Sequence, residues 1–314
     1  MKNSSGKIYG GIEAGGTKFL CAVGTGPADL LLKRIETATP QKTIDEVVRF
    51  FQPYTARKAG GRLVAAGIAS FGPLELKKES PRYGYITTTP KPGWTNVNLA
   101  GRIKDALGVP VAIDTDVNGA ALGEQEWGAA RGLSTFIYVT IGTGIGGGGV
   151  INGELMHGLA HPEMGHIRIP RADKENRGFN GSCRFHGDCW EGLASGASMQ
   201  QRWGKAPEEI LKSDTVYHRA WDLEASYIAT GICNLICPLS PQRVILGGGI
   251  MNHPGLLEAV QQKVGQLLNK YIPALDSPGK IRNYIVRPAL KSARTGAFLS
   301  GVLGAIVLAK QTGR

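Results

Sequence analysis

Two short glycine turns, each joining apolar strand-like segments, constrain the fold of this chain more than any other feature. The first is Gly15-Gly16-Thr17, within a strand-turn-strand pattern that runs from Ile8 to Gly24. The second is Gly142-Thr143-Gly144, which follows a strand predicted at 135–140. Because glycine lacks a Cβ atom, such turns can bring backbone N–H groups close to phosphate oxygens. Each turn alone is more typical of a tight hairpin than of a nucleotide site.

After each turn, helix-like and strand-like periodicity alternate along the chain. In the first half, this pattern predicts strands at 28–35, 62–70 and 109–113 and helices beginning near Thr43 and Asn98. In the second half, it predicts helices at 220–237 and 254–271 and strands at 243–246 and 281–286. The repeated order indicates a faint internal duplication, and therefore two α/β lobes with a cleft between them.

The predicted lobes differ in size. We expect a smaller N-terminal α/β lobe at 1–117, completed by a C-terminal helix at 293–310, and a larger lobe at 118–292. The most apolar stretch, 297–309, is shorter than the ~20 residues needed to span a bilayer. It predicts a buried helix, and we expect no membrane association.

The amino-acid composition limits the binding partners and the cellular compartment that we expect for this chain. The 314 residues carry a formal net charge of +11, yet they contain no Lys/Arg run or basic amphipathic helix. The charge therefore indicates attraction to anionic small molecules such as nucleotides, and we expect no nucleic-acid partner. The five cysteines are an odd number, and the first residues do not resemble a signal peptide. These features favour a reducing, cytoplasmic setting.

A short loop carries a candidate metal site. Cys183, His186 and Cys189 have C-x-x-H-x-x-C spacing, and His166 lies seventeen residues before the first of them. Zinc prefers four nitrogen or sulfur ligands in a tetrahedron, so these four residues predict a closed structural zinc site. A disulfide between the two cysteines, or two unused thiols, is the alternative.

Taken together, these segments resemble the ROK sugar kinases, whose fold is the two-lobed, actin/hexokinase-like (ribonuclease H-like) α/β fold. The resemblance covers nearly the whole chain, with an inserted zinc loop at 161–192. The matching segments are 13–18 and 141–147 for the phosphate loops, 247–250 for the adenosine-binding glycines, 116–124 for the catalytic base, and 161–192 for the sugar and zinc.

The resemblance implies a role for each matching residue, with ATP, Mg²⁺ and structural Zn²⁺ as cofactors and a homodimer as the assembly. Asp116 would be the general base. The sugar would be bound by Thr115, Glu163, His166 and Glu191, and zinc by His166, Cys183, His186 and Cys189. ATP and Mg²⁺ would be held by Glu13, Gly15, Gly16, Thr17, Lys18, Gly142, Thr143, Gly144, Gly247, Gly248 and Gly249.

Departures from the common family pattern point to one branch. Glu13 stands where most members have Asp, Thr115 where many have Asn, and His186 where many have a third zinc-binding cysteine. With the segment 89–94, these residues resemble bacterial fructokinases, which phosphorylate the C6 hydroxyl of fructose. The competing functions are those of a glucokinase, a mannokinase, an N-acetyl amino-sugar kinase or a catalytically silent sugar-sensing regulator. A DNA-binding repressor is not expected, because the first phosphate loop begins at residue 13.

Several of these residues could instead have structural roles. Asp116 could be an ordinary helix N-cap, and Asp114 is the second candidate for the base. Glu163 could pair with Arg168. Glu191 could be an acid at the start of a helix, and Lys18 could be a solvated strand residue. His157 and His161 could make structural contacts, and we expect Cys233 and Cys237 in the core.

Overall fold

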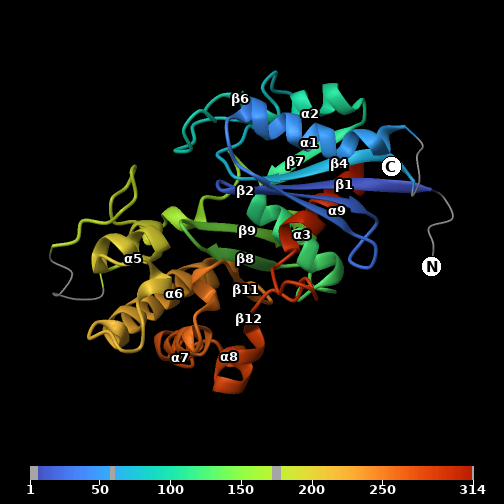
Figure 1. The fold of residues 1–314 in the computed structure, drawn as a ribbon. Helices are drawn as coiled ribbons and strands as arrows, with labels where there is room; N and C mark the ends of the chain where they lie inside the picture. The colour runs from blue at the N-terminus through green and yellow to red at the C-terminus, as the bar shows by residue number, and fades with distance from the viewer. Residues whose placement is uncertain (1–5, 57–60, 172–177, 313–314) are drawn as a thin grey trace. The chain divides into compact units, whose positions relative to one another are not determined.

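The computed structural model describes residues 6–56, 61–171 and 178–312 (Figure 1). The described chain forms two compact units. Unit 1 lies within 1–132, 155–162 and 288–314, and unit 2 within 133–154 and 163–287. The domain boundaries expected from the sequence, after residues 117 and 292, stay predictions.

Unit 1 is built on a five-stranded mixed sheet with the order β3-β2-β1-β4-β7. The antiparallel part is β1 with β2 and β2 with β3, and the parallel part is β1 with β4 and β4 with β7. The strands are β1 (Lys7–Ala14), β2 (Lys18–Gly24), β3 (Leu31–Glu36), β4 (Arg62–Ser70) and β7 (Val111–Thr115). A small hairpin, β5 (Tyr85–Ile86) and β6 (Val97–Asn98), lies outside this sheet.

Unit 2 repeats the same strand order as β10-β9-β8-β11-β12. Its central strand β8 is antiparallel to β9 and parallel to β11, as β1 is to β2 and β4. The strands are β8 (Phe136–Ile141), β9 (Ile145–Ile151), β10 (Glu154–Leu155), β11 (Val244–Gly247) and β12 (Ile285–Val286). The predicted duplication is therefore confirmed at the level of sheet topology.

Helices cover both faces of the unit 1 sheet (Figure 1). Neighbouring residues of β1 show this directly: a Cβ atom on Gly10 would lie 2.9 Å from Phe51, and one on Gly11 would lie 2.8 Å from Ile306. Successive strand residues face opposite sides, so the helices carrying Phe51 and Ile306 lie on opposite faces. These helices are α1 (Pro40–Thr55), accompanied by α2 (Leu99–Leu107), and α9 (Ser300–Thr312), accompanied by α3 (Asp116–Trp127).

The principal helices of unit 2 are α4 (Trp190–Ala194), α5 (Gly196–Trp203), α6 (Tyr217–Leu239), α7 (Leu256–Leu268) and α8 (Pro278–Tyr284). The two longest, α6 and α7, pack against each other. Among the residues described, no helix is both long enough and apolar enough to cross a bilayer.

Three sequence-based predictions were wrong. The strand expected at 281–286 is mostly helix α8, because Ser277 caps its N-terminus and Pro278 is in its first turn; only Ile285–Val286 forms a strand. The C-terminal helix begins at Ser300 instead of residue 293. Cys233 is half-buried and Cys237 is exposed, so neither is a core residue.

Candidate active site and metal centre

The candidate catalytic residues of unit 1 lie at one edge of its sheet. Parallel pairing places Ala14 of β1 opposite Ser70 of β4, and Ser70 opposite Thr115 of β7. These strands therefore end at the same edge, where the Gly15–Thr17 turn follows β1 and Asp116 follows β7. In open α/β sheets, ligands bind outside the carboxyl ends of the strands, so this is the expected edge for a site.

Asp116 is the first residue of helix α3, and it is not the N-cap. The cap is Thr115, whose Oγ1 accepts a hydrogen bond from the N–H of Asn118 at 3.1 Å. Asp116 Oδ1 accepts from the N–H of Val117 at 2.9 Å. The carboxylate therefore lies at the start of a helix, where the backbone dipole stabilises negative charge. The N-cap alternative for Asp116 was wrong, because Thr115 already fills that position.

Glu13 lies close enough to Asp116 for the two charges to interact. Burial raises the pKa of the Glu13 carboxyl to about 7, and repulsion from Asp116 adds to this shift. Lys18 and a hydrogen bond from the backbone of Val302 act in the opposite direction. A cation beside this pair would reduce the repulsion and favour the ionised form of Glu13.

The first glycine turn is a hydrogen-bonded hairpin whose tip is exposed to solvent. The N–H of Gly15 donates to the carbonyl of Lys18 at 3.0 Å, and Thr37 Oγ1 donates to the carbonyl of Gly15 at 2.8 Å. Gly16, Thr17 and Lys18 are exposed, so this tip is accessible to a ligand.

The second glycine turn is held by helices α4 and α5, which follow the predicted zinc ligand Cys189. The N–H of Gly196, the first residue of α5, donates to the carbonyl of Gly142 at 2.7 Å. Glu191 of α4 reaches the far side of the turn, where its Oε2 accepts from the N–H of Ile145 at 2.9 Å. This contact places the predicted sugar-binding acid directly beside the predicted phosphate turn, and no local pattern in the sequence indicates it.

The third glycine cluster lies next to the second turn. In the parallel pairing of β11 with β8, Gly247 is opposite Thr140, so both clusters follow the carboxyl ends of adjacent strands. Gly248 has φ +95°, and a Cβ atom there would collide with the backbone of Ile141. Glycine is therefore required at this position, and its backbone can be approached closely.

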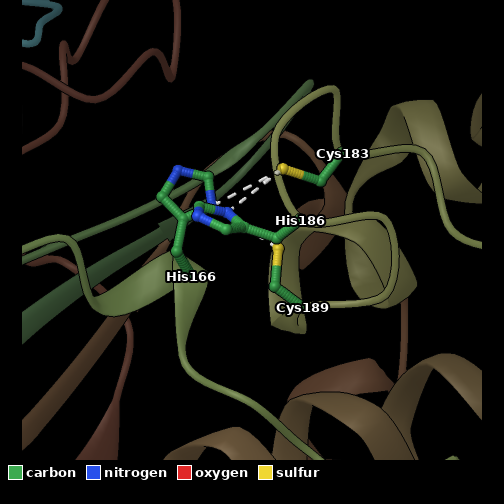
Figure 2. Close-up of side chains that lie close together, drawn as sticks. All are labelled: His166, Cys183, His186 and Cys189. Carbon is green, nitrogen blue, oxygen red and sulfur yellow. Dashed lines mark hydrogen bonds between the residues drawn. The ribbon is translucent and has the colours of Figure 1, made fainter.

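The four predicted zinc ligands come together, as Figure 2 shows. One nitrogen or sulfur atom from each of His166, Cys183, His186 and Cys189 lies within 4.8 Å of all the others. His166 Nδ1 is 3.4 Å from the Cys189 sulfur and 3.7 Å from the Cys183 sulfur, and His186 Nδ1 is 3.6 Å from the Cys183 sulfur. No disulfide joins the cysteines, so the disulfide alternative was wrong. The two-sulfur, two-nitrogen donor set fits zinc.

The backbone of the loop from Cys183 to Cys189 brings these side chains together. Cys183 and Gly187 exchange two backbone hydrogen bonds, of 3.1 and 2.9 Å, which close a tight turn around His186. Cys189 is the N-cap residue of α4 and is fully buried. Arg168 binds Asp188 within the same loop, and the suggested pairing of Glu163 with Arg168 stays a prediction.

His166 presents its two ring nitrogens to different neighbours. Its Nδ1 faces the two cysteine sulfurs, whereas its Nε2 lies 3.9 Å from the Glu163 carboxylate. A metal bound at Nδ1 would fix the tautomer and the ring direction, and Nε2 would remain available as a hydrogen-bond donor beside Glu163.

The two extra histidines of the segment 155–162 both have partners within unit 1. His161 is buried, and its Nε2 accepts from the N–H of Leu74 at 3.1 Å. His157 Nε2 lies 2.9 Å from Asp114 Oδ2. Asp114 is buried and already paired, which disfavours it as an alternative base.

The two sheets repeat one topology and carry glycine turns at their carboxyl edges, which places the chain in the class of α/β folds built from two duplicated sheets. The chain belongs to the ROK family, whose model matches residues 9–312. It is 44% identical over 310 residues to a fructokinase of Zymomonas mobilis, covering 98% of both chains. It is 42% identical over 294 residues to a fructokinase of Lactococcus lactis, covering 92% of this chain and 95% of the relative.

Solved structures agree with this assignment. A ROK hexokinase from Thermus thermophilus is similar with a TM-score of 0.75 and 25% identity, over 97% of this chain and 98% of that protein. The expected fold, enzyme class and family are confirmed.

Proposed function

We propose that this protein is a fructokinase, which transfers the γ-phosphoryl group of ATP to the C6 hydroxyl of fructose. The observation that carries the proposal is the near-complete match to fructokinases at 42–44% identity. The geometry of each unit supports it. In unit 1, the Gly15–Thr17 turn and Asp116 follow the carboxyl ends of β1 and β7. In unit 2, the Gly142–Gly144 turn follows β8, and Glu191 binds the next residue, Ile145.

In the proposed reaction, Asp116 accepts the proton of the C6 hydroxyl as that oxygen forms a bond to the γ-phosphorus. The bond between the γ-phosphorus and the β,γ-bridging oxygen breaks, and ADP leaves. Catalysis of this kind depends on positioning and charge neutralisation. The carboxylate of Asp116 chiefly orients the hydroxyl, and it takes the proton late in the step.

The glycine clusters would hold ATP. Backbone N–H groups and threonine hydroxyls of Gly15–Thr17 and Gly142–Gly144 would contact phosphate oxygens, with Lys18 nearby. The backbone of Gly247–Gly249 would contact the adenosine. Mg²⁺ supplies charge neutralisation between the phosphates when bound, and Glu13 is the residue that would hold it.

The sugar would be recognised by Glu163, His166 and Glu191, with Thr115 at the end of β7. Acidic and imidazole groups discriminate between sugars because a missing hydroxyl leaves a buried polar group without its partner. Zinc would act at a distance from the reaction by fixing the orientation of His166.

Replacing the proposed base tests the mechanism. Asp116→Asn keeps the size of the side chain but removes the proton acceptor, so we expect kcat to fall by about 10²- to 10⁴-fold. Thermal unfolding and ATP binding should change little. Asp105→Asn, at an exposed position of α2, is the matched control and should retain full activity. An Asp116→Asn enzyme with more than half of the original kcat would contradict the proposed role.

The substrate is tested by comparing kcat/KM for fructose, mannose, glucose, N-acetylglucosamine and N-acetylmannosamine with ATP and Mg²⁺. Fructose should give the highest value. A higher value for another sugar would assign the protein to a different kinase of the family, and no turnover with any of them would favour a sugar-sensing regulator. Light scattering of the same sample tests the proposed homodimer.

A further inference from the structure

His157 contacts the segment that carries the proposed base, although it is 41 positions away from Asp116 in sequence. Its Nε2 lies 2.9 Å from Oδ2 of Asp114, the residue two positions before the base. The Asp114 side chain is only 6% exposed, whereas that of His157 is 42% exposed. A buried carboxylate without a countercharge is costly, so His157 stabilises the charge of Asp114 when its imidazole is protonated.

The other oxygen of Asp114 binds the turn between β7 and α3. Asp114 Oδ1 accepts from the N–H of Thr115 and from Nδ2 of Asn118, each at 2.8 Å. Thr115 in turn caps α3 by accepting the N–H of Asn118. These three bonds join residues that precede and follow Asp116 in the sequence. The orientation of the Asp114 side chain therefore fixes the conformation of the backbone that carries the proposed base.

We propose that His157 is a positioning residue for phosphoryl transfer, which holds Asp114 and, through it, the turn that carries Asp116. The inference rests on the proposed function, because it assigns His157 a role in the same reaction. His157 acts through the Asp114 carboxylate, and the role requires no contact with substrate.

The segment that carries His157 is anchored independently of it. His161, four residues later, is buried and accepts the N–H of Leu74. Replacing the half-exposed His157 should therefore remove the contact to Asp114 without releasing the segment. This separation makes a variant of His157 informative about catalysis.

The pair also has a pH dependence with a defined sign. The hydrogen bond and the charge of Asp114 raise the pKa of His157, against a smaller effect of burial. Asp114 from β7 and Asn118 from α3 face the imidazole, and the phenol of Tyr83 is within electrostatic reach of Asp114. The imidazolium charge is present below the raised pKa and is lost as the pH rises through it, so positioning should weaken on the alkaline side.

Steady-state kinetics of two variants test the role. His157→Ala removes the donor, and we expect kcat to fall about tenfold with KM for fructose and ATP changed less than about twofold. His157→Gln can still donate to Asp114, so it should recover most of kcat, and its pH profile should lack the alkaline inflection of the wild type. His218→Gln, at an exposed position of α6, is the control and should match the wild type.

A double-mutant cycle shows whether the effect passes through Asp114. If it does, His157→Ala should cause no further loss of kcat in an Asp114→Asn background. Additive losses, an unchanged kcat in His157→Ala, or a loss confined to KM for fructose would each overturn the proposal. The last result would mean that His157 contacts the sugar directly.

An activity-independent measurement separates this inference from the proposed function. NMR titration of the His157 imidazole should give a pKa above the ordinary value in the wild type and a lower one in Asp114→Asn. Equal pKa values would overturn the pairing, even if fructose is phosphorylated. Conversely, a wild type that pairs as expected but phosphorylates no sugar would refute the proposed function, and the positioning role with it.

Discussion

Glu13 and Asp116 are two carboxyl groups that share one edge of a sheet, and their charges repel each other. Burial and the charge of Asp116 both favour the protonated form of Glu13, which brings its pKa to about 7. A bound Mg²⁺ would invert this preference, because it stabilises the ionised form. The residue proposed to hold the metal is therefore one that would release a proton when the metal binds, so metal affinity should increase with pH.

The raised pKa of Glu13 predicts a pH-dependent stability in the absence of metal and ATP. The folded state holds a proton on Glu13 between its ordinary pKa of 4.5 and about 7, where the unfolded state has lost it. The free energy of unfolding should therefore decrease as the pH rises through this window, by up to about 3 kcal/mol. Glu13→Gln, which cannot ionise, should remove this component of the slope.

Chemical denaturation of wild type and Glu13→Gln at several values between pH 4.5 and 7.5 measures the difference. Glu79→Gln, at an exposed loop position, controls for the loss of a surface charge. Parallel curves for wild type and Glu13→Gln would show that Glu13 has an ordinary pKa.

Helix α4 connects three predicted functions within unit 2 although it is only five residues long. Its N-cap is the predicted metal ligand Cys189, and its second residue is the predicted sugar-binding acid Glu191. The Glu191 carboxylate accepts the N–H of Ile145, just after the predicted phosphate turn. The sugar-binding role of Glu191 comes from the family resemblance and stays a prediction, whereas the convergence of Cys183, His186 and Cys189 was predictable from their short spacing. The contact to Ile145 was not, since the two residues are 46 positions apart and the pattern of neither one indicates the other.

This arrangement predicts that a bound metal supports sugar binding indirectly, by holding the loop and helix α4 in place. Metal analysis should find one zinc ion per chain, and removing it with a chelator or by Cys189→Ser should lower the thermal midpoint and raise KM for fructose by about 10-fold or more. KM for ATP should change less. Cys237→Ser, at an exposed position of α6, should keep both the metal and the activity. A zinc-free protein of full stability and activity would contradict a structural metal site.

At the scale of the whole molecule, the repeated sheet order explains why so much of the fold was predictable. Glycine turns between apolar strands marked the start of each repeat, and buried strands such as 62–70 were recognisable from continuous apolar runs. The failure at 281–286 has a local cause, since the capping signal of Ser277 and Pro278 outweighs a short apolar alternation. The pairing of Asp114 with His157 depends on tertiary contact, which no periodicity encodes.

The net charge of +11 belongs to no single element, and it predicts a salt effect on one substrate only. ATP is a polyanion, so a positive protein attracts it over distances that salt shortens, from a Debye length of about 10 Å at 0.1 M to about 3 Å at 1 M. Fructose is uncharged and experiences no such attraction. Raising sodium chloride from 0.05 to 0.5 M should therefore raise KM for ATP about threefold and leave KM for fructose nearly constant. Sodium acetate at equal ionic strength should give the same result, because screening does not depend on the anion. An ATP KM that is independent of salt, or one that rises only with chloride, would mean that the charge is too dispersed to assist nucleotide capture.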